Sequence, residues 1–278
     1  MRYVHLQASP PDLCPVCTLH GRRQLFVSVA TDLQGAVERG EIQAWFQPQI
    51  DMSTGRIVAV EALCRWQHPE RGLVMPGGFI PEAEESGAIH DIGDFMLREG
   101  CRHSAMWREA GFQLDVSVNV SAVQLSTPGV FELLHELLTE FALPEGTLTI
   151  EITESQLIAD LNAVAERLMR LQSSGLGISL DDFGTGHSSL SQLQDLPITE
   201  LKIDRSLIQD SSSTGGALMA VAVALLQERG VRVVAEGVEN EEHLARVRGM
   251  RCDRAQGYLF GRPMPADEID TMLAAQLS

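Results

Sequence analysis

Basic residues are scarce in this chain of 278 residues, which has 21 Lys and Arg against 38 Asp and Glu, a formal net charge of −17. A surface of that sign repels the phosphates of nucleic acids and of anionic membranes, which argues against duplex nucleic acid as a partner and against a membrane-surface role. An anionic small molecule would need local cations to bind here, and divalent metal ions are the usual means. The charge therefore favours a metal site over a basic phosphate-binding loop.

Long hydrophobic runs are also missing. The longest, Ala217–Leu226, is about half as long as a membrane span and predicts a buried helix, so no membrane insertion is expected. The first 30 residues lack a basic start followed by an apolar core, so no signal peptide is expected. There are five cysteines, Cys14, Cys17, Cys64, Cys101 and Cys252. An odd and scattered set of this kind favours a reducing cytoplasm over a disulfide scaffold.

The amino-terminal residues differ from the rest, with several prolines, a Cys14-x-x-Cys17 pair and no clear periodicity. We interpret residues 1–27 as a poorly ordered extension or a tether to partners, and residues 28–278 as one domain. A structural metal site or a redox switch at Cys14 and Cys17 is the alternative, although a lone pair lacks the second half of a zinc site. Cys64, Cys101 and Cys252 are expected in or near the core.

From about Ser28 the sequence alternates short apolar runs with helical patterns, which is typical of βα units and a mostly parallel sheet. At this length, an α/β fold of the TIM type, a (β/α)8 barrel, is favoured over an open doubly wound sheet. The expected strands are Ile42–Ile50, Ile57–Val60, Val116–Val120, Leu148–Ile152, Leu176–Leu180, Glu200–Ile203, Val231–Ala235 and Ala255–Phe260. The expected helices include Phe131–Phe141, Asp160–Ser173 and Ala217–Arg229, and Gly111, Gly175 and Gly230 are expected to end helices.

Each strand after the first runs into a polar residue of a kind that carries chemistry. In chain order these are Glu61, Asn119, Glu151, Asp181-Asp182, Lys202, Glu236 and Gln256. The carboxyl ends of barrel strands converge on one mouth, where catalytic groups lie in TIM barrels. One polar strand end alone is equally consistent with a solvated side chain or a helix cap. The whole series predicts a site.

Carboxylates that converge without a counter-charge repel one another, and bound cations relieve the repulsion. Oxygen ligands suit Mg²⁺ or Mn²⁺, while the lack of His and Cys among them argues against zinc. The adjacent carboxylates Asp181 and Asp182 are suited to bridge two metal ions, an arrangement that supports in-line phosphodiester cleavage. Lys202 could then orient the attacking water or stabilise the transition state, and Glu236 could act as a ligand or a general base.

The same residues form an ordered series of motifs. They are Gln47-Pro48, Glu61-Ala62-Leu63 followed by Arg65-Trp66, Asn119-Val120-Ser121, Glu151-Ile152-Thr153-Glu154-Ser155, Asp181 to Gly186 (DDFGTG), Leu201-Lys202-Ile203-Asp204, Ala235-Glu236-Gly237-Val238-Glu239 and Gln256-Gly257-Tyr258-Leu259-Phe260. The series, which lies within residues 28–272, resembles the EAL domain family of cyclic-di-GMP phosphodiesterases. Departures are few: His187 stands where the family often has Tyr, and Leu207 where Phe is common.

The resemblance implies the EAL variant of the TIM barrel and hydrolysis of cyclic-di-GMP to linear pGpG with two Mg²⁺ or Mn²⁺ ions. It also implies a homodimer. Glu61, Asn119, Glu151 and Asp181 match the ligands of one metal, and Asp181, Asp182 and Glu236 match those of the second. The implied catalytic residues are Lys202, Glu236 and Glu61, and Glu154 matches a glutamate that braces the DDFGTG loop. Nucleotide-binding positions are matched by Gln47, Leu63, Arg65, Asp204 and Gln256.

Two other functions are open at this point. One is a catalytically silent EAL module that binds cyclic-di-GMP or a protein as a receptor, although such modules typically lose a ligand that is kept here. The other is an unrelated metal-dependent barrel of the enolase type, with Lys202 as its base, which leaves the ordered motifs unexplained. Arg65-Trp66 alone is consistent with a cation–π packing pair. The sequence has no GG[DE]EF motif, so control by a separate regulatory protein is one expectation.

Overall fold

The computed structural model describes residues 29–127, 129–153, 161–184, 196–209 and 213–277, with the backbone alone for 161–163 and 213–220. The predicted extension (1–27) with its two cysteines lies outside the described residues, as do Glu154 and His187. The expectations that concern them stay predictions.

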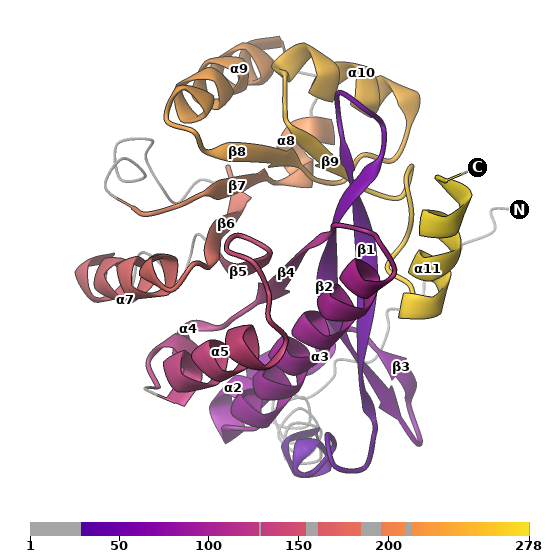
Figure 1. Cartoon of the computed structure of the whole chain (residues 1–278), viewed down its shortest axis with the longest axis vertical. Coiled ribbons are helices and arrows are strands. Elements are labelled where there is room, and N and C mark those ends of the chain that lie inside the picture. Colours follow the sequence, from indigo (N-terminus) through magenta and orange to yellow (C-terminus); the bar gives the residue numbers. More distant parts are fainter. Residues whose placement is uncertain (1–28, 128, 154–160, 185–195, 210–212, 278) are drawn as a thin grey trace, which may run out of the picture.

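A single sheet closes on itself to form the core of the molecule. Its strands are β1 (Ile42–Asp51), β2 (Ile57–His68), β3 (Gly72–Val74), β4 (Asp115–Asn119), β5 (Leu148–Thr153), β6 (Gly177–Phe183), β7 (Glu200–Ile203), β8 (Arg232–Ala235) and β9 (Arg254–Gln256). They are hydrogen-bonded in the order β1-β9-β8-β7-β6-β5-β4-β2-β3, and β1 also pairs with β2, which closes a barrel of eight strands (Figure 1). The predicted TIM-type barrel is confirmed, and the open sheet is excluded.

Strand β1 departs from a regular (β/α)8 barrel because it is antiparallel to both of its neighbours, β2 and β9, whereas the other barrel pairs are parallel. The reason is the short connection to β2, since only antiparallel strands can be joined by a tight hairpin. The Asp51 carboxylate stabilises this turn by accepting hydrogen bonds from the backbone N–H of Ser53 (3.1 Å) and Thr54 (2.7 Å). Gln47 in β1 thereby lies opposite Glu61 in β2.

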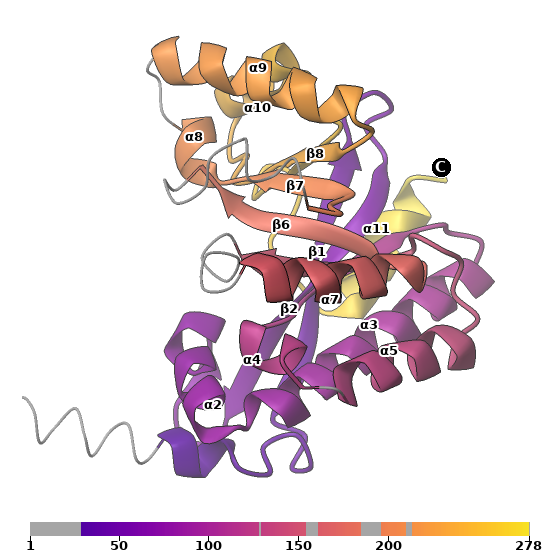
Figure 2. The same ribbon diagram turned by 90° about the vertical axis from the view of Figure 1, so that its left-hand side faces the viewer.

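The helices lie on the outside of the barrel (Figures 1 and 2). They are α2 (Ile80–Ser86), α3 (Ile89–Glu109), α4 (Ala122–Leu125), α5 (Gly129–Glu140), α7 (Leu161–Ser173), α8 (Arg205–Gln209), α9 (Ser213–Glu228), α10 (Glu241–Met250) and α11 (Ala266–Ala275), with a 3-10 turn, η1, at Pro76–Gly78. The expected helices correspond to α5, α7 and α9, and the glycines at 111, 175 and 230 all have positive φ angles after a helix. In α3, Gly100 permits close packing, because a Cβ there would lie 2.9 Å from Val118 Cγ2.

Helix α9 differs from the fully buried helix that its apolar run predicts. Ala222, Val223 and Leu226 are buried, but Val221 and Leu225 are 58% and 50% exposed. A helix on the outside of a barrel has one face on the sheet and another towards solvent, so an apolar sequence does not make it buried all round. Among the described residues, no helix is both long and apolar enough to cross a membrane.

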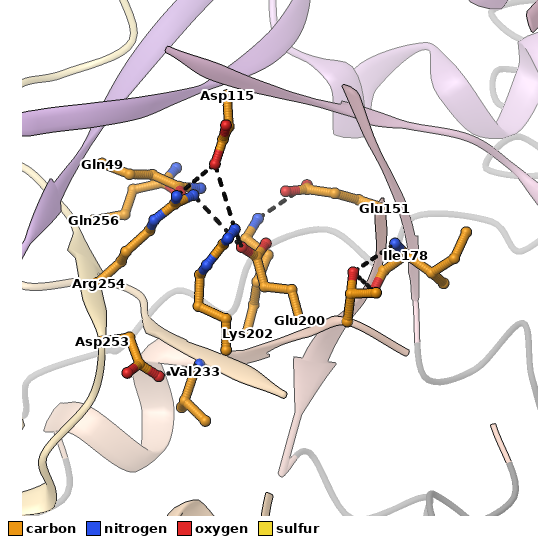
Figure 3. Close-up of polar contacts among 12 residues, drawn as sticks. Gln49, Asp115, Glu151, Ile178, Glu200, Lys202, Val233, Asp253, Arg254 and Gln256 are labelled. Carbon is orange, nitrogen blue, oxygen red and sulfur yellow. Dashed lines mark hydrogen bonds and ion pairs between the residues drawn. The ribbon is translucent and has the colours of Figure 1, made fainter. Parts of the chain in front are cut away.

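The amino-terminal end of the barrel is closed by four charged side chains, which we call the closing ion cluster: Asp115, Glu200, Arg232 and Arg254. Figure 3 labels Asp115, Glu200 and Arg254. Each is the first residue of its strand, in β4, β7, β8 and β9. Arg232 contacts Glu200 at 3.1 Å and Asp115 at 3.5 Å, and Arg254 pairs with the same two carboxylates. Two cations balance two anions, so the closing ion cluster is formally neutral.

Candidate active site

The polar residues predicted at the strand ends meet inside the opposite, carboxyl-terminal end of the barrel, which we call the mouth. Asn119 and Gln256 are the last residues of β4 and β9, and Glu236 directly follows β8. Glu61 is an exception, because it lies in the middle of β2, which continues to His68. Strand β2 runs past the rim of the barrel, since it pairs with β1 and β3 over its outer half. The apolar run before Glu61 therefore ends where β2 passes the rim of the barrel, and the strand itself continues to His68.

Lys202 lies at the centre of the mouth and has no exposed surface. Its Nζ atom is 2.7 Å from Glu236 Oε1, 3.0 Å from Glu151 Oε2, 3.1 Å from Glu61 Oε2 and 3.5 Å from Asp181 Oδ1. Lys202, which the sequence predicted beside the carboxylates, is therefore enclosed by them. Its ammonium group is the shared counter-ion of four carboxylates, which come from β2, β5, β6 and the residue after β8.

Two amide side chains complete the contacts around Glu61. Asn119 Nδ2 donates to Glu61 Oε1 (2.8 Å) and to Glu151 Oε2 (3.2 Å), and Gln256 Nε2 donates to Glu61 Oε2 (2.6 Å). Because the Asn119 nitrogen faces the two carboxylates, its Oδ1 atom is the one that it could offer to a cation. Both oxygens of Glu61 are held by donors from other strands, β4 for Asn119 and β9 for Gln256.

Asp181 and Asp182 are neighbours in sequence, so a regular strand would point their side chains to opposite faces of the sheet. The pairing between β6 and β7 shifts register between Leu180 and Phe183, and Asp182 has a left-handed φ of +60°. Such a bulge redirects the side chains, and the left-handed conformation of a non-glycine residue costs about 1 kcal/mol or more. The backbone irregularity thus allows Asp181 and Asp182 to share one acidic group with Glu236.

The carboxylates of the mouth form two groups whose oxygens lie within 4.8 Å of one another: Glu61, Glu151 and Asp181 in one, and Asp181, Asp182 and Glu236 in the other. Asp181 belongs to both. Glu151 Oε1 is buried and has no hydrogen-bond partner among the described residues. An unpartnered buried carboxylate oxygen is costly, and a hard cation such as Mg²⁺ or Mn²⁺ would satisfy it. The residues present therefore fit two divalent cations with oxygen ligands.

The crowding of the carboxylates raises the pKa values of several of them. Burial raises the pKa of Asp181 to about 6 and that of Glu236 to about 8, and in both cases the neighbouring carboxylates add to the rise while Lys202 opposes it. Burial also raises the pKa of Glu151 well above its usual range. Without further cations, part of the negative charge of the mouth is therefore neutralised by protons.

Lys202 and Glu61 differ from these carboxylates, because their surroundings favour the charged form of each group. Burial alone would lower the pKa of Lys202, but the four surrounding carboxylates raise it well above its usual value. Burial alone would raise the pKa of Glu61, but the Lys202 ammonium and the hydrogen bond from Gln256 hold it below its usual value. Both groups are therefore charged at neutral pH.

Two cavities open beside the mouth. The larger, of about 720 Å³, runs from the carboxylates towards the apolar side chains of Ile80, Ile89 and Met96. The smaller, of about 170 Å³, contains Gln47, Arg205, Gln256 and Tyr258 in its wall. Glu61 and Leu63 line both cavities. The predicted nucleotide-binding residue Leu63 is thus placed between two spaces on either side of the acidic group.

The other predicted nucleotide-binding residues occupy different settings. Gln47 and Gln256 are 7% and 4% exposed and bonded to each other, so their side chains belong to the inner wall of the barrel. Asp204 is half-buried and accepts a hydrogen bond from Ser206 N (2.9 Å) at the start of α8. Arg65, the last of these residues, lies over Trp45, so the alternative of a cation–π pair between Arg65 and Trp66 is wrong.

The guanidinium of Arg65 lies over Trp45, 5.5 Å from the ring centroid, and Arg65 is only 3% exposed. Trp66 is fully buried and donates from Nε1 to Glu41 Oε2 (3.1 Å). Successive residues in a strand point to opposite faces, so Arg65 cannot share a face with its neighbour Trp66. It pairs instead across the β1–β2 hairpin.

Sequence reasoning missed Gln49. This residue is 1% exposed, and its Nε2 donates to Gln256 Oε1 (3.0 Å). The signal was present, because Gln49 follows Gln47 by two residues in a strand and such residues lie on the same face. It also missed Arg205, which contributes a cation to the wall of the smaller cavity.

Comparison with known proteins agrees with this site. The family model described as the EAL domain matches residues 30–263. A curated relative in Pseudomonas aeruginosa, the bifunctional diguanylate cyclase/cyclic di-GMP phosphodiesterase MucR, is 38% identical over 91% of this chain and 37% of its own length. The chain spans well under half the length of that relative.

Solved structures show the same architecture. The structure described as the PaMucR phosphodiesterase in complex with c-di-GMP has a TM-score of 0.82 at 39% identity, covering 87% of this chain and 99% of the other. The EAL enzyme Bd1971, in a form bound to cAMP and cyclic-di-GMP, has a TM-score of 0.84 at 26% identity, covering 93% of this chain and 72% of the other. With its barrel, its acidic mouth and a match over most of its length, this chain belongs to the EAL domain family.

Proposed function

We propose that this chain hydrolyses cyclic-di-GMP to linear pGpG and requires Mg²⁺ or Mn²⁺ to do so. The observation that carries the proposal is the mouth itself, in which five carboxylates, Asn119 and Lys202 come together at the base of a cavity. No ligand position of the implied two-metal site is lost. Relatives described as phosphodiesterases, and solved relatives described as complexes with cyclic-di-GMP, support the substrate.

The chain's own groups would divide the work as follows. Glu61, Asn119, Glu151 and Asp181 would hold one cation, and Asp181, Asp182 and Glu236 would hold the second. Bound cations would supply activation of water and stabilisation of charge on the phosphate oxygens. The carboxylates fix the positions of those charges, and the barrel keeps the ligands on rigid strand ends.

Lys202 would act as a fixed positive charge. In the absence of metal ions, the four carboxylates raise its pKa, so the ammonium keeps its proton at neutral pH. It is suited to orient an attacking water and to stabilise developing negative charge on the phosphate. The match of the EAL domain model to residues 30–263 argues against the enolase-type alternative.

The two cavities suit a ligand with two arms. Cyclic-di-GMP has two guanosine units joined by two phosphates, and the cavities flank Glu61 and Leu63 on either side. In the smaller cavity, Arg205 offers a positive charge and Tyr258, which is half-exposed, offers an aromatic face. Leu63 would separate the two arms while the carboxylates face the scissile phosphate.

The test is a turnover assay with the purified chain, cyclic-di-GMP and either Mg²⁺ or Mn²⁺. We expect pGpG to form. Its formation should stop when the cations are chelated and resume when they are restored. Binding of cyclic-di-GMP without turnover would refute the hydrolase and favour the silent receptor. The homodimer stays a prediction from the resemblance, and sedimentation of the purified chain would test it. The cytoplasmic location and a separate regulatory protein stay predictions from the sequence.

A further inference from the structure

We infer that Gln49 is a positioning residue of the mouth, which orients Gln256 and, through it, the carboxylate of Glu61. The inference rests on the metal site of the proposed function. It concerns a side chain that touches neither the acidic groups nor the cavities, and that acts only through its neighbour.

The position of Gln49 is fixed by the pairing of β1 with β9. Gln49 and Gln256 are partners across this antiparallel pair, and Gln49 Nε2 donates to Gln256 Oε1 at 3.0 Å (Figure 3). Both side chains point into the barrel and are nearly inaccessible, at 1% and 4% exposure. Because water has so little access, a lost protein partner for Gln256 Oε1 would leave a buried oxygen unsatisfied.

The hydrogen bond from Gln49 belongs to a chain of amides that ends on a metal-binding carboxylate. Gln256 Nε2 donates to Glu61 Oε2 at 2.6 Å and to Gln47 Oε1 at 2.9 Å. Gln47 Nε2 in turn donates to the backbone carbonyl of Gly261 at 3.0 Å. Gln256 thus uses both of its N–H bonds and its oxygen, and Gln49 supplies the partner for the oxygen.

The direction of this chain is determined by its two ends. A carboxylate such as Glu61 and a backbone carbonyl such as that of Gly261 can only accept hydrogen bonds. The nitrogen atoms of Gln256 and Gln47 must therefore face these ends, which leaves Gln256 Oε1 facing Gln49. A donor at position 49 favours this orientation of Gln256, whereas an apolar side chain there would let the amide rotate away from Glu61.

Loss of the Gln49 donor should therefore weaken metal binding without removing any ligand. Groups that orient a metal ligand typically change metal affinity by about tenfold to a hundredfold. Glu61 keeps its contacts with Lys202 and Asn119, so we expect the lower end of that range, about tenfold.

The experiment is a double-mutant cycle with Mn²⁺ affinity as its readout, measured by calorimetry on the purified full chain. Gln49→Met keeps the size of the side chain and removes its donor, and Gln256→Met removes the residue through which Gln49 acts. We expect Gln49→Met to weaken Mn²⁺ binding about tenfold alone and to have no further effect when Gln256→Met is present. Ser179→Ala, which removes another buried polar group of the barrel interior, should leave Mn²⁺ affinity unchanged.

Unchanged Mn²⁺ affinity in folded Gln49→Met would overturn the inference, and so would independent, additive effects of Gln49→Met and Gln256→Met. Circular dichroism establishes folding, and if Gln49→Met does not fold, Gln49→Asn provides the test, because its shorter side chain places the amide out of reach. A parent chain that binds Mn²⁺ but does not cleave cyclic-di-GMP would refute the proposed hydrolase and leave the cycle intact. The two failures are therefore distinguishable.

Discussion

The two ends of the barrel are built from the same kinds of side chain but differ in charge balance. At the amino-terminal end, the closing ion cluster pairs two arginines with two carboxylates. At the mouth, five carboxylates are accompanied by one ammonium group, which contacts four of them, so there is a formal excess of four negative charges. Both sets include a carboxylate that is almost fully buried, Glu200 with 3% and Glu151 with 0% of its side chain exposed, so burial alone does not explain the difference.

The difference in charge balance indicates which end of the barrel is complete without a ligand. A cluster that neutralises itself stabilises or closes a fold, and it gains nothing from added cations. A cluster with a large excess of one charge must recruit protons or metal ions, and the raised pKa values of Asp181 (about 6) and Glu236 (about 8) show the tendency to recruit protons. The imbalance therefore marks the functional end of the barrel.

The largest effect is expected for Asp181→Ala, which removes the carboxylate that both acidic groups share. Cleavage of cyclic-di-GMP should fall by roughly 10²–10³-fold or more, because charge stabilisation at the phosphate depends on both cations. Chromatography measures the formation of pGpG, and calorimetry measures the loss of Mn²⁺ binding. A folded variant with near-normal rates would show that the mouth does not hold the metals as assigned.

Lys202→Met would increase the imbalance, since it removes the ammonium group that contacts four carboxylates. We expect the metal-free variant to be less stable than the parent by about 3–5 kcal/mol, which is typical when one partner of a buried ion pair is removed. Added Mn²⁺ should raise its unfolding temperature more than that of the parent, while cleavage is lost. Equal stability of the two metal-free proteins would contradict the role of Lys202 as counter-ion.

Glu200→Gln would test the neutral end. It leaves both arginines of the closing ion cluster with Asp115 alone, so the free energy of unfolding should fall by about 2 kcal/mol. Mn²⁺ affinity and the cleavage rate should stay unchanged, because the cluster is at the opposite end of the strands. Glu136→Gln on the exposed face of α5 is the matched control and should be near neutral. A loss of Mn²⁺ affinity in Glu200→Gln would show that the two ends are coupled.

The last expected effect needs no substitution and is the pH dependence of metal binding. Asp181 and Glu236 have raised pKa values of about 6 and about 8, so below these values a cation must displace a proton. Mn²⁺ affinity should therefore rise with pH, by up to about tenfold per unit while one proton is released, and level off above about pH 8. Calorimetry in buffers of different ionisation enthalpy counts the released protons. A flat affinity between pH 6 and pH 8 would argue against protons as the competing occupants.

Much of the mouth could be read from the sequence because parallel strands impose a simple rule. Their carboxyl ends meet at one edge, so polar residues that follow apolar runs must converge. That rule placed Asn119, Glu151 and Lys202 together without any knowledge of side-chain geometry. It did not reveal that Glu61 is in mid-strand, because a strand that extends past the rim has the same local pattern as one that ends there.

Other features depend on contacts between residues far apart in the chain. The closing ion cluster joins four strands, and nothing near Arg254 in sequence indicates that its partners are Asp115 and Glu200. The role of Gln49 depends on the register between β1 and β9, which is set by the barrel as a whole. The hairpin between β1 and β2 likewise decides that Arg65 pairs with Trp45.

The sequence by itself determined the barrel, the family and the identity of the groups at the mouth, because alternation and strand-end chemistry are local properties. Only the tertiary structure decided their balance of charge. It enclosed Lys202 among four carboxylates, turned Asp181 and Asp182 into one acidic group through a bulge, and paired two arginines with two carboxylates at the other end. Electrostatic energy depends on distance through space, and those distances exist only once the strands have closed into a barrel.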